Sequence, residues 1–241
     1  MSEFRQRWRL TVCRGPDARD VAHRDVVSGW EAALRASGLP LAETAAARPR
    51  PRILFAAPVP VGMLAQRELI DVGLTECRLV HEVREAVGAA APSGYRLVDL
   101  YDVWTGAPTL PSLVVAADYR ASLTAGPGTE SDTAGEGWTG LGDPLDAAIA
   151  ELLASRRIEI GREKGGGVVT VDIRSHLLSL RGTSGANGSI RLDMRLLLGG
   201  AAGVGRPEEV VTALAGRLGR GLALTEVVRE RIHLADDPAL D

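Results

Sequence analysis

Ile53-Leu-Phe-Ala-Ala57, Pro58-Val-Pro-Val-Gly62 and Glu68-Leu-Ile-Asp-Val-Gly-Leu74 are the stretches that decide the fold of this chain. The first and the last are short apolar runs, which are typical of β-strands, and the proline- and glycine-rich segment between them is typical of a turn. The sequence therefore predicts two consecutive strands within residues 53–74.

A helix is predicted on each side of this strand pair, over residues 21–37 and 76–88. Asp20 can serve as the N-cap of the first helix, and both segments carry an apolar stripe at helical spacing. Further strands are expected outside the helices, at residues 8–13 and 95–104, where apolar and polar residues alternate. The resulting order, β-α-β-β-α-β, is that of a ferredoxin-like fold.

The second half repeats this order of elements, although not the residues themselves. After a linker at 105–111, strands are predicted at 113–123, 157–160, 168–173, 189–197 and 226–234, a further candidate strand at 177–180, helices at 144–153 and 207–218, and a long loop at 125–142. We therefore expect an α+β protein of two tandem ferredoxin-like (β-α-β-β-α-β) subdomains with antiparallel sheets, at residues 1–104 and 113–241.

Composition indicates a globular protein of the cytoplasm. Of the 241 residues, 45% are apolar and 24% are charged, which is enough to bury a core. No apolar run approaches the roughly 20 residues that span a membrane. The two cysteines, Cys13 and Cys77, do not have the spacing of metal ligands, and so few cysteines are a weak sign of export. We expect a cytoplasmic chain with no membrane segment, no metal and no cofactor.

Charge is unevenly distributed along the chain. The net charge is −3, so the chain as a whole lacks the basic character of many nucleic-acid-binding proteins. Residues 1–60, however, contain ten arginines against six acidic residues, a net charge of +4. This region is suited to an anionic partner, although Lys164 is the only lysine and a GC-rich genome would also produce many arginines.

His23-Arg-Asp25 opens the first predicted helix. A histidine within reach of a carboxylate can move protons near neutral pH, and a helix N-terminus attracts anions. Equally, Asp25 can complement the helix dipole while His23 is an ordinary polar residue of the surface. Spacing alone leaves both interpretations open.

Arg48-Pro-Arg-Pro-Arg52 directly precedes an apolar strand. The prolines stiffen the backbone, so Arg48, Arg50 and Arg52 are presented with little ordering entropy to lose. Guanidinium groups suit bidentate phosphate contacts, and the segment therefore favours RNA binding. The alternative is a solvated loop whose prolines set the entry into the strand.

Several segments between residues 8 and 75 resemble, in order, the radical-SAM-linked protein family. They are His23-Arg-Asp25, Trp30-Glu-Ala-Ala-Leu-Arg35, Gly38-Leu-Pro-Leu-Ala42, Pro49-Arg-Pro-Arg-Ile53, Phe55-Ala56, Pro58-Val-Pro-Val-Gly62, and Glu68 with Asp71. Members of that family are domains of uncharacterised function, fused behind a radical SAM enzyme of the cobalamin-binding type or encoded beside one. The length of this chain fits the separate form.

The resemblance implies a radical SAM protein as partner. This chain has no Cys-x-x-x-Cys-x-x-Cys cluster ligands, so it cannot itself be the radical SAM catalyst, and the purified protein is expected to be colourless and free of iron. It departs from the family pattern at Ala22, where a serine is usual, at Ala46 and Ala47, which replace part of a Gly-Phe-Asn, and at Leu69, where a tyrosine is usual. If those positions make the site, the site is altered here.

Three functions are compatible with these observations. The leading hypothesis is a non-catalytic accessory protein that binds the substrate, RNA, for a radical SAM enzyme, through Arg48, Arg50, Arg52, His23 and Arg35. The second is an RNA-processing enzyme that uses His23 with Asp25, and the third is a protein-docking module with an exposed apolar patch. Tandem ferredoxin-like halves also occur in RNA-processing endonucleases and pseudouridine synthases, which is an analogy of fold alone.

Overall fold

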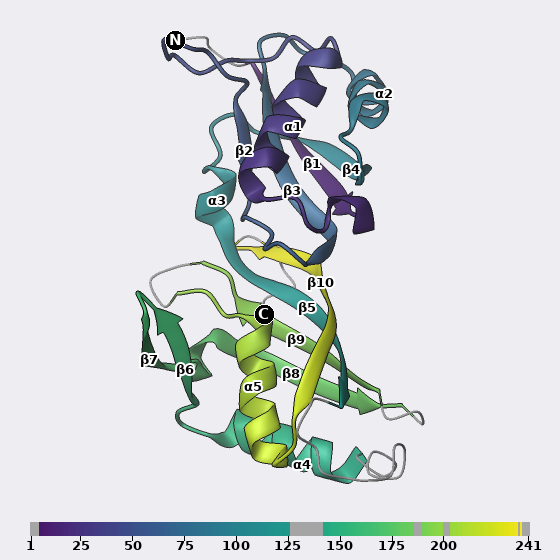
Figure 1. Ribbon diagram of the computed structural model, residues 1–241. Coiled ribbons are helices and arrows are strands. Elements are labelled where there is room, and N and C mark those ends of the chain that lie inside the picture. Colours follow the sequence, from purple (N-terminus) through teal and green to yellow (C-terminus); the bar gives the residue numbers. More distant parts are fainter. Residues whose placement is uncertain (1–4, 126–141, 186–188, 200–202, 236, 238–241) are drawn as a thin grey trace. The chain divides into compact units, whose positions relative to one another are not determined.

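A computed structural model of the chain describes residues 5–125, 142–185, 189–199, 203–235 and 237 (Figure 1). The chain divides into two compact units. Unit 1 consists of Met1–Val114 together with Arg229–Asp241, and unit 2 of Val115–Val228. The predicted loop at 125–142 lies almost wholly outside the described residues. In the described part of the chain, no helix is both long enough and apolar enough to cross a membrane.

Unit 1 has the predicted order of elements in its N-terminal part. They are β1 (Gln6–Arg14), the 3-10 turn η1 (Pro16–Ala18), α1 (His23–Ala36), β2 (Ile53–Phe55), β3 (Leu64–Leu74), α2 (Val80–Ala90), β4 (Tyr95–Val103) and the short α3 (Leu110–Leu113). β1 lies between β4 and β3 and is antiparallel to both, and the three-residue β2 pairs with the other edge of β3.

Helices α1 and α2 cover one face of the unit 1 sheet (Figure 1). Alternate residues of a strand point to opposite faces, and on β1 Trp8, Leu10 and Val12 face the helices, where they are buried with Trp30 of α1 and Val83 of α2. Burying each such side chain stabilises the fold by roughly 1.5–3 kcal/mol. The intervening residues Arg7, Arg9 and Thr11 point to the opposite face, which these helices do not cover, although all three residues are buried there; we call it the open face.

Unit 2 contains most of the remaining elements. They are β5 (Val114–Ala125), α4 (Gly142–Ala154), β6 (Glu159–Lys164), β7 (Gly167–Asp172), the 3-10 turn η2 (Arg174–His176), β8 (Leu177–Ser184), β9 (Ile190–Leu197), α5 (Pro207–Leu218) and the first part of β10 (Leu222–Leu234). Here the strand order is β10-β5-β9-β8, while β6 and β7 form a separate two-stranded sheet.

The strands predicted at 157–160 and 168–173 correspond to β6 and β7, although β6 begins two residues later and extends to Lys164; these two strands pair with each other instead of joining the large sheet. The candidate strand at 177–180 is the one that joins it, as β8. The reason is burial: β7 is exposed over most of its length, whereas β8 buries Leu177 and Leu180.

The described strands outside the β6–β7 hairpin belong to one large, mostly antiparallel sheet, in the order β4-β1-β3-β10-β5-β9-β8 with β2 beside β3. The expectation of two separate sheets is therefore wrong. The physical reason is the length of β10, which was predicted over 226–234 and extends over 13 residues, enough to take part in both units. The units differ accordingly from the expected subdomains at 1–104 and 113–241, because Arg229–Asp241 groups with the N-terminal part of the chain.

Gly94 shows how tightly the turn before β4 packs. Its φ is +77°, and an added Cβ would lie 2.6 Å from the backbone nitrogen of Ala18. Gly94→Ala should therefore lower the free energy of unfolding by more than about 1 kcal/mol. Gly88→Ala, in a helical position of α2 with open space around it, should raise it by about 0.5–1 kcal/mol. Urea denaturation of both variants checks this, and a Gly94→Ala protein as stable as the wild type would contradict it.

Candidate functional site

Residues of three sequence motifs meet at a small cavity on the helix side of unit 1. His23 comes from the first turn of α1, Phe55 from β2 and Glu68 from β3, and Arg14 and Tyr95 also line the cavity. Its volume is about 20 Å³, which is room for about one water molecule. The motif residues therefore converge in space, but on a cavity too small for a nucleotide.

Arg14 is buried beside this cavity, with 1% of its surface exposed. Its guanidinium donates hydrogen bonds to the carbonyl oxygens of Ala18 (2.8 and 3.0 Å), Arg19 (2.9 Å), Val21 (2.8 Å) and Val59 (3.1 Å). A buried charge is tolerated only where dipoles or counter-charges replace water. Here backbone carbonyls do so, and the guanidinium thereby ties the segment before α1 to the turn after β2.

Glu68 and Arg229 form a buried ion pair within unit 1. The Arg229 Nε donates to Glu68 at 2.7 Å and a terminal nitrogen bonds the second carboxylate oxygen, so the contact is bidentate. Arg229 also donates to the carbonyl oxygens of Ala57 and Pro58, at 3.1 and 3.2 Å. The pair joins residues 161 positions apart and fixes the last strand against the Pro58 turn.

His23 is held uncharged more readily than an ordinary histidine. Burial lowers its pKa, and the positive charges of Arg14 and Arg229 lower it further. Its ring packs edge-on against Phe55, with 5.5 Å between the ring centroids. Burial likewise raises the pKa of Tyr95. At neutral pH the cavity therefore presents a neutral imidazole and a neutral phenol beside the Glu68–Arg229 pair.

Asp25 does not line this cavity. Its side chain is exposed and lies 3.5 Å from Arg24. It points away from His23 because residues two apart on a helix do not share a face. The structure thus brings His23 together with Glu68, and not with its neighbour in sequence.

Two of the arginines expected to bind RNA have acidic partners. Arg35 pairs with Glu43 and Arg50 pairs with Glu31, each at 2.7 Å. The Arg50–Glu31 pair, together with a hydrogen bond from Arg35 to the Pro49 carbonyl oxygen at 3.1 Å, attaches the proline-rich segment 48–52 to α1.

The other two predicted arginines lie differently. Arg48 is exposed, while Arg52 lines a pocket on the open face that is described below. In the described ranges of the chain, no group of three His, Cys, Asp or Glu side chains could hold a metal ion.

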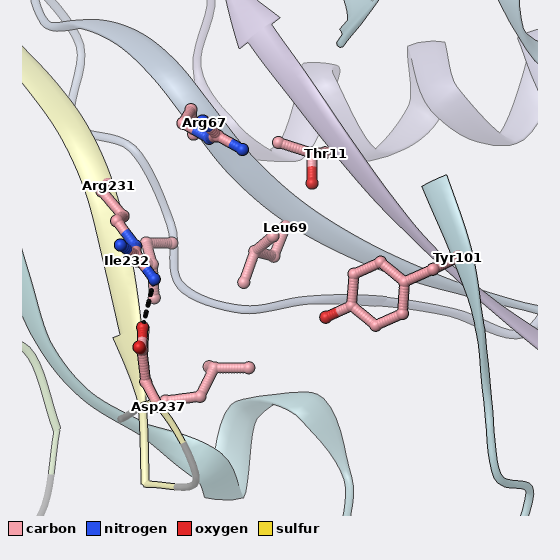
Figure 2. Close-up of a pocket in the computed structure, with 8 residues that line it drawn as sticks. Thr11, Arg67, Leu69, Tyr101, Arg231, Ile232 and Asp237 are labelled. Carbon is pink, nitrogen blue, oxygen red and sulfur yellow. Dashed lines mark hydrogen bonds and ion pairs between the residues drawn. The ribbon is translucent and has the colours of Figure 1, made fainter. Parts of the chain in front are cut away.

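The open face of unit 1 contains a larger pocket, of about 400 Å³, which we call the tyrosine pocket (Figure 2). Its polar lining residues are Thr11 of β1, Arg67 of β3, Tyr101 of β4, Arg231 of β10 and Asp237. The Tyr101 hydroxyl points into the pocket from one side, and Arg231, bonded to Asp237 at 2.6 Å, lies on the other (Figure 2). Tyr101 is 47% exposed. An aromatic ring and two guanidiniums therefore meet at one accessible cavity.

A buried ion pair lies next to this pocket on the same face. Arg9 donates to both carboxylate oxygens of Asp71, at 2.7 and 3.0 Å. Burial alone would lower the pKa of Arg9, but the hydrogen bonds and charges of Asp71 and, to a smaller extent, Tyr101 outweigh it and raise the pKa. Asp71, a motif residue, therefore serves to fix β1 against β3.

Sequence reasoning missed the tyrosine pocket. The signal that could have found it is the alternation along β1, β3 and β4, which places Thr11, Leu69 and Tyr101 on the face opposite the core. What the alternation cannot show is that Arg231, from the far end of the chain, lies against the same face.

The chain was compared with models of known protein families. A family model described as "Uncharacterized protein conserved in bacteria (DUF2344)" matches residues 7–207. The chain belongs to this family. The match with the DUF2344 model includes residues of both units and ends before residues 208–241. No curated protein matches the chain.

Two solved structures are similar. One is a chain of a Cbf5-Nop10-Gar1 complex, with a TM-score of 0.50 and 10% identity over 92% of this chain and 49% of that one. This chain thus spans about half the length of that protein, and the likeness shows the fold alone. The other is described as a candidate glycine cleavage system transcriptional repressor, with a TM-score of 0.25 and 10% identity over 93% of this chain and 98% of that one; so low a score carries no argument.

The Glu68–Arg229 pair leads to a prediction about stability. Arg229→Met leaves the Glu68 carboxylate buried without its counter-charge and should lower the free energy of unfolding by about 3–5 kcal/mol. Adding Glu68→Leu removes the remaining charge, so the double variant should be more stable than Arg229→Met alone. Urea denaturation measures both. A double variant less stable than the single one would contradict the assignment.

His23 leads to a prediction about pH. Its pKa is lower in the folded state than in the unfolded chain, so protonation of His23 favours unfolding. The resulting loss of folding stability is absent above about pH 7 and grows as the pH falls below about 6.5. His23→Gln should therefore lose less stability than the wild type between about pH 7 and pH 5. His81→Gln, which removes an exposed histidine of α2, is the control. Parallel pH profiles for His23→Gln and the wild type would refute the shift.

Proposed function

We propose that this DUF2344 protein is a non-catalytic accessory protein that binds single-stranded RNA on the open face of unit 1, as substrate for a radical SAM enzyme. The observation that carries the RNA part is the tyrosine pocket, where Tyr101, Arg67 and Arg231 line one cavity of about 400 Å³.

The chemistry of this pocket suits a single strand. Proteins that bind single-stranded nucleic acid combine a positive groove for the backbone with aromatic rings on which bases stack. Arg67 and Arg231 can contact phosphates, and Tyr101 offers half of its surface to a base. RNA-recognition motifs also bind RNA through aromatic residues on the face of a four-stranded sheet, which supports the proposal by analogy of fold.

Asp237 sets a limit on the affinity. It pairs with Arg231 at 2.6 Å, so a phosphate has to replace this carboxylate before Arg231 can bind it. The Arg231 side chain is 48% exposed but the Asp237 side chain only 11%, so the pair is less screened than a fully exposed one, which is worth about 1 kcal/mol or less. RNA binding through Arg231 should therefore be weak, and strongest at low salt.

We also infer that the two units are tandem ferredoxin-like repeats, as the sequence predicts. Unit 1 has the strand order β4-β1-β3-β2, and the strands associated with unit 2 have the order β10-β5-β9-β8. Numbered within each half, with the β6–β7 hairpin set aside as an insertion, both orders are 4-1-3-2. The equal orders support an internal repeat of topology.

The radical SAM partner rests on the family resemblance. The chain has two cysteines, both free, and lacks cluster ligands of its own, so it would present the substrate and leave the chemistry to its partner. Affinity purification of the tagged chain from its own host should recover a radical SAM protein together with RNA. Recovery of RNA without such a protein would remove the partnership and leave the RNA-binding role.

The acid–base alternative has less support. His23 and Asp25 do not share a cavity, and the cavity that His23 lines holds about one water. We therefore assign a structural role to His23, and we propose that the ligand binds to the open face.

The RNA proposal predicts the effect of two arginines. Each phosphate contact that is formed releases counterions, so affinity should fall steeply with salt. Arg67→Ala with Arg231→Ala should weaken binding of a labelled single-stranded RNA by about 1–3 kcal/mol per lost contact near 50 mM salt, and should flatten the salt dependence. Fluorescence anisotropy over a salt series measures both quantities.

Arg48→Ala with Arg50→Ala removes the same charge from the proline-rich segment and is the matched comparison. Under the proposal this variant binds nearly as well as the wild type and keeps its salt slope. If it loses the affinity instead, the RNA lies on the arginine segment and the tyrosine pocket is the wrong surface. If the wild type binds no RNA near 50 mM salt, the protein-docking hypothesis takes its place.

A further inference from the structure

A second pocket opens on the same face of unit 1, beside the segment that follows β4; we call it the linker pocket. Its volume is about 360 Å³, within the range of small-molecule sites. One side is formed by the strand residues Leu54, Asp71 and Gly73, and the other by Thr105, Ala107 and Thr109.

The linker side of this pocket is held in place by Arg7 of β1. The Arg7 guanidinium is 6% exposed and donates to the carbonyl oxygens of Trp104 (2.9 Å), Ala107 (3.1 Å) and Pro108 (3.2 Å). The amide of Ala107 also donates to the Trp104 carbonyl at 3.0 Å, which closes a turn. The wall is therefore preorganised, so that little ordering entropy is lost when a ligand binds.

Positive charge prevails in the linker pocket. Its charged lining residues are Arg7, Arg52 and Asp71, and Asp71 is already matched by the bidentate contact with Arg9. Arg52 belongs to the arginine segment 48–52 and is an exposed residue at the pocket wall. An apolar cavity with arginine at its side matches a planar group that carries a phosphate.

Strand register connects the two pockets. Leu54 lies opposite Asp71 on the β2–β3 ladder, and Thr11 lies opposite Leu69 on the β1–β3 ladder, so alternate residues of β3 from Gly73 to Arg67 line one face. Six residues of strand span about 20 Å. Both pockets therefore lie along one face of β3, with the buried Arg9 and Asp71 between them.

We infer that the linker pocket takes one unpaired nucleobase of the RNA strand, with an adjoining phosphate at Arg52. This inference rests on the proposed function. The faces of the base contact Leu54 and Ala107, and its polar edge meets the hydroxyls of Thr105 and Thr109. Unstacked bases of single strands are recognised in this way, by apolar contact on the face and hydrogen bonds at the edge.

A substitution that fills the pocket tests the inference. Leu54 is 39% exposed, so Leu54→Trp can occupy the cavity without disturbing the core, and it should weaken binding of a single-stranded RNA about tenfold. Leu79→Trp introduces the same ring at an exposed position before α2 and should leave binding unchanged. Thermal denaturation of both variants checks that each is folded.

Abasic oligonucleotides provide the decisive comparison. With the wild-type protein, removing one base at a single position of the RNA should weaken binding about tenfold, whereas Leu54→Trp should bind the intact and abasic strands equally. If Leu54→Trp binds as the wild type does and no abasic position matters, the inference is overturned while the proposed function stands. If Leu54→Trp abolishes capture of a radical SAM protein but not RNA binding, the pocket is a protein-docking site. If the wild type binds no RNA, both proposals fall together.

Discussion

The buried ion pair between Arg229 and Glu68 is the interaction on which unit 1 depends. Removing two charges from water is costly, and the cost is offset only where the geometry is bidentate and the remaining donors are satisfied. Both conditions hold, because Arg229 bonds both carboxylate oxygens and two backbone carbonyls. The pair commits the last strand of the chain to the N-terminal unit and frames the cavity that contains His23.

Two other buried arginines, like Arg229, donate hydrogen bonds to backbone carbonyl oxygens. Arg14 donates to carbonyls of the segment before α1 and of the turn after β2, and Arg7 donates to carbonyls of the segment after β4. Each holds irregular backbone in one conformation by satisfying its carbonyl oxygens. Arg14 lies on the helix side of the sheet, beside a cavity of about 20 Å³, whereas Arg7 lies on the open face, which contains pockets of about 360 and 400 Å³. This division of the sheet is the reason that the proposed ligand is assigned to the open face.

Local patterns in the sequence were sufficient for much of unit 1. Alternation located β1, and helical spacing located α1 and α2. His23 and Glu68, both singled out by the expected family resemblance, line the same cavity. The partner of His23 could not be predicted, because Asp25 is near in sequence but on another side of the helix. Arg229 is 161 positions from Glu68, and no local pattern carries a contact over that distance.

The arginine segment and the second half show the same limit. Charge and proline content favoured phosphate binding at 48–52, but Glu31, on a helix 19 positions earlier, pairs with Arg50. In unit 2, residues 168–173 have the composition of a core strand and form an exposed hairpin, while the less regular segment 177–184 enters the large sheet. Packing between distant segments decides which strands share a sheet, and this packing cannot be predicted from the composition of a single segment.

In the proposed function RNA binds to the open face of unit 1, and photocrosslinking tests this most directly. A single-stranded RNA that contains 4-thiouridine would be irradiated with the wild-type protein and the linked peptides identified by mass spectrometry. The account predicts crosslinks at Tyr101 and within residues 104–109, both on the open face. Crosslinks confined to α1 and residues 46–50, with none on the open face, would contradict it.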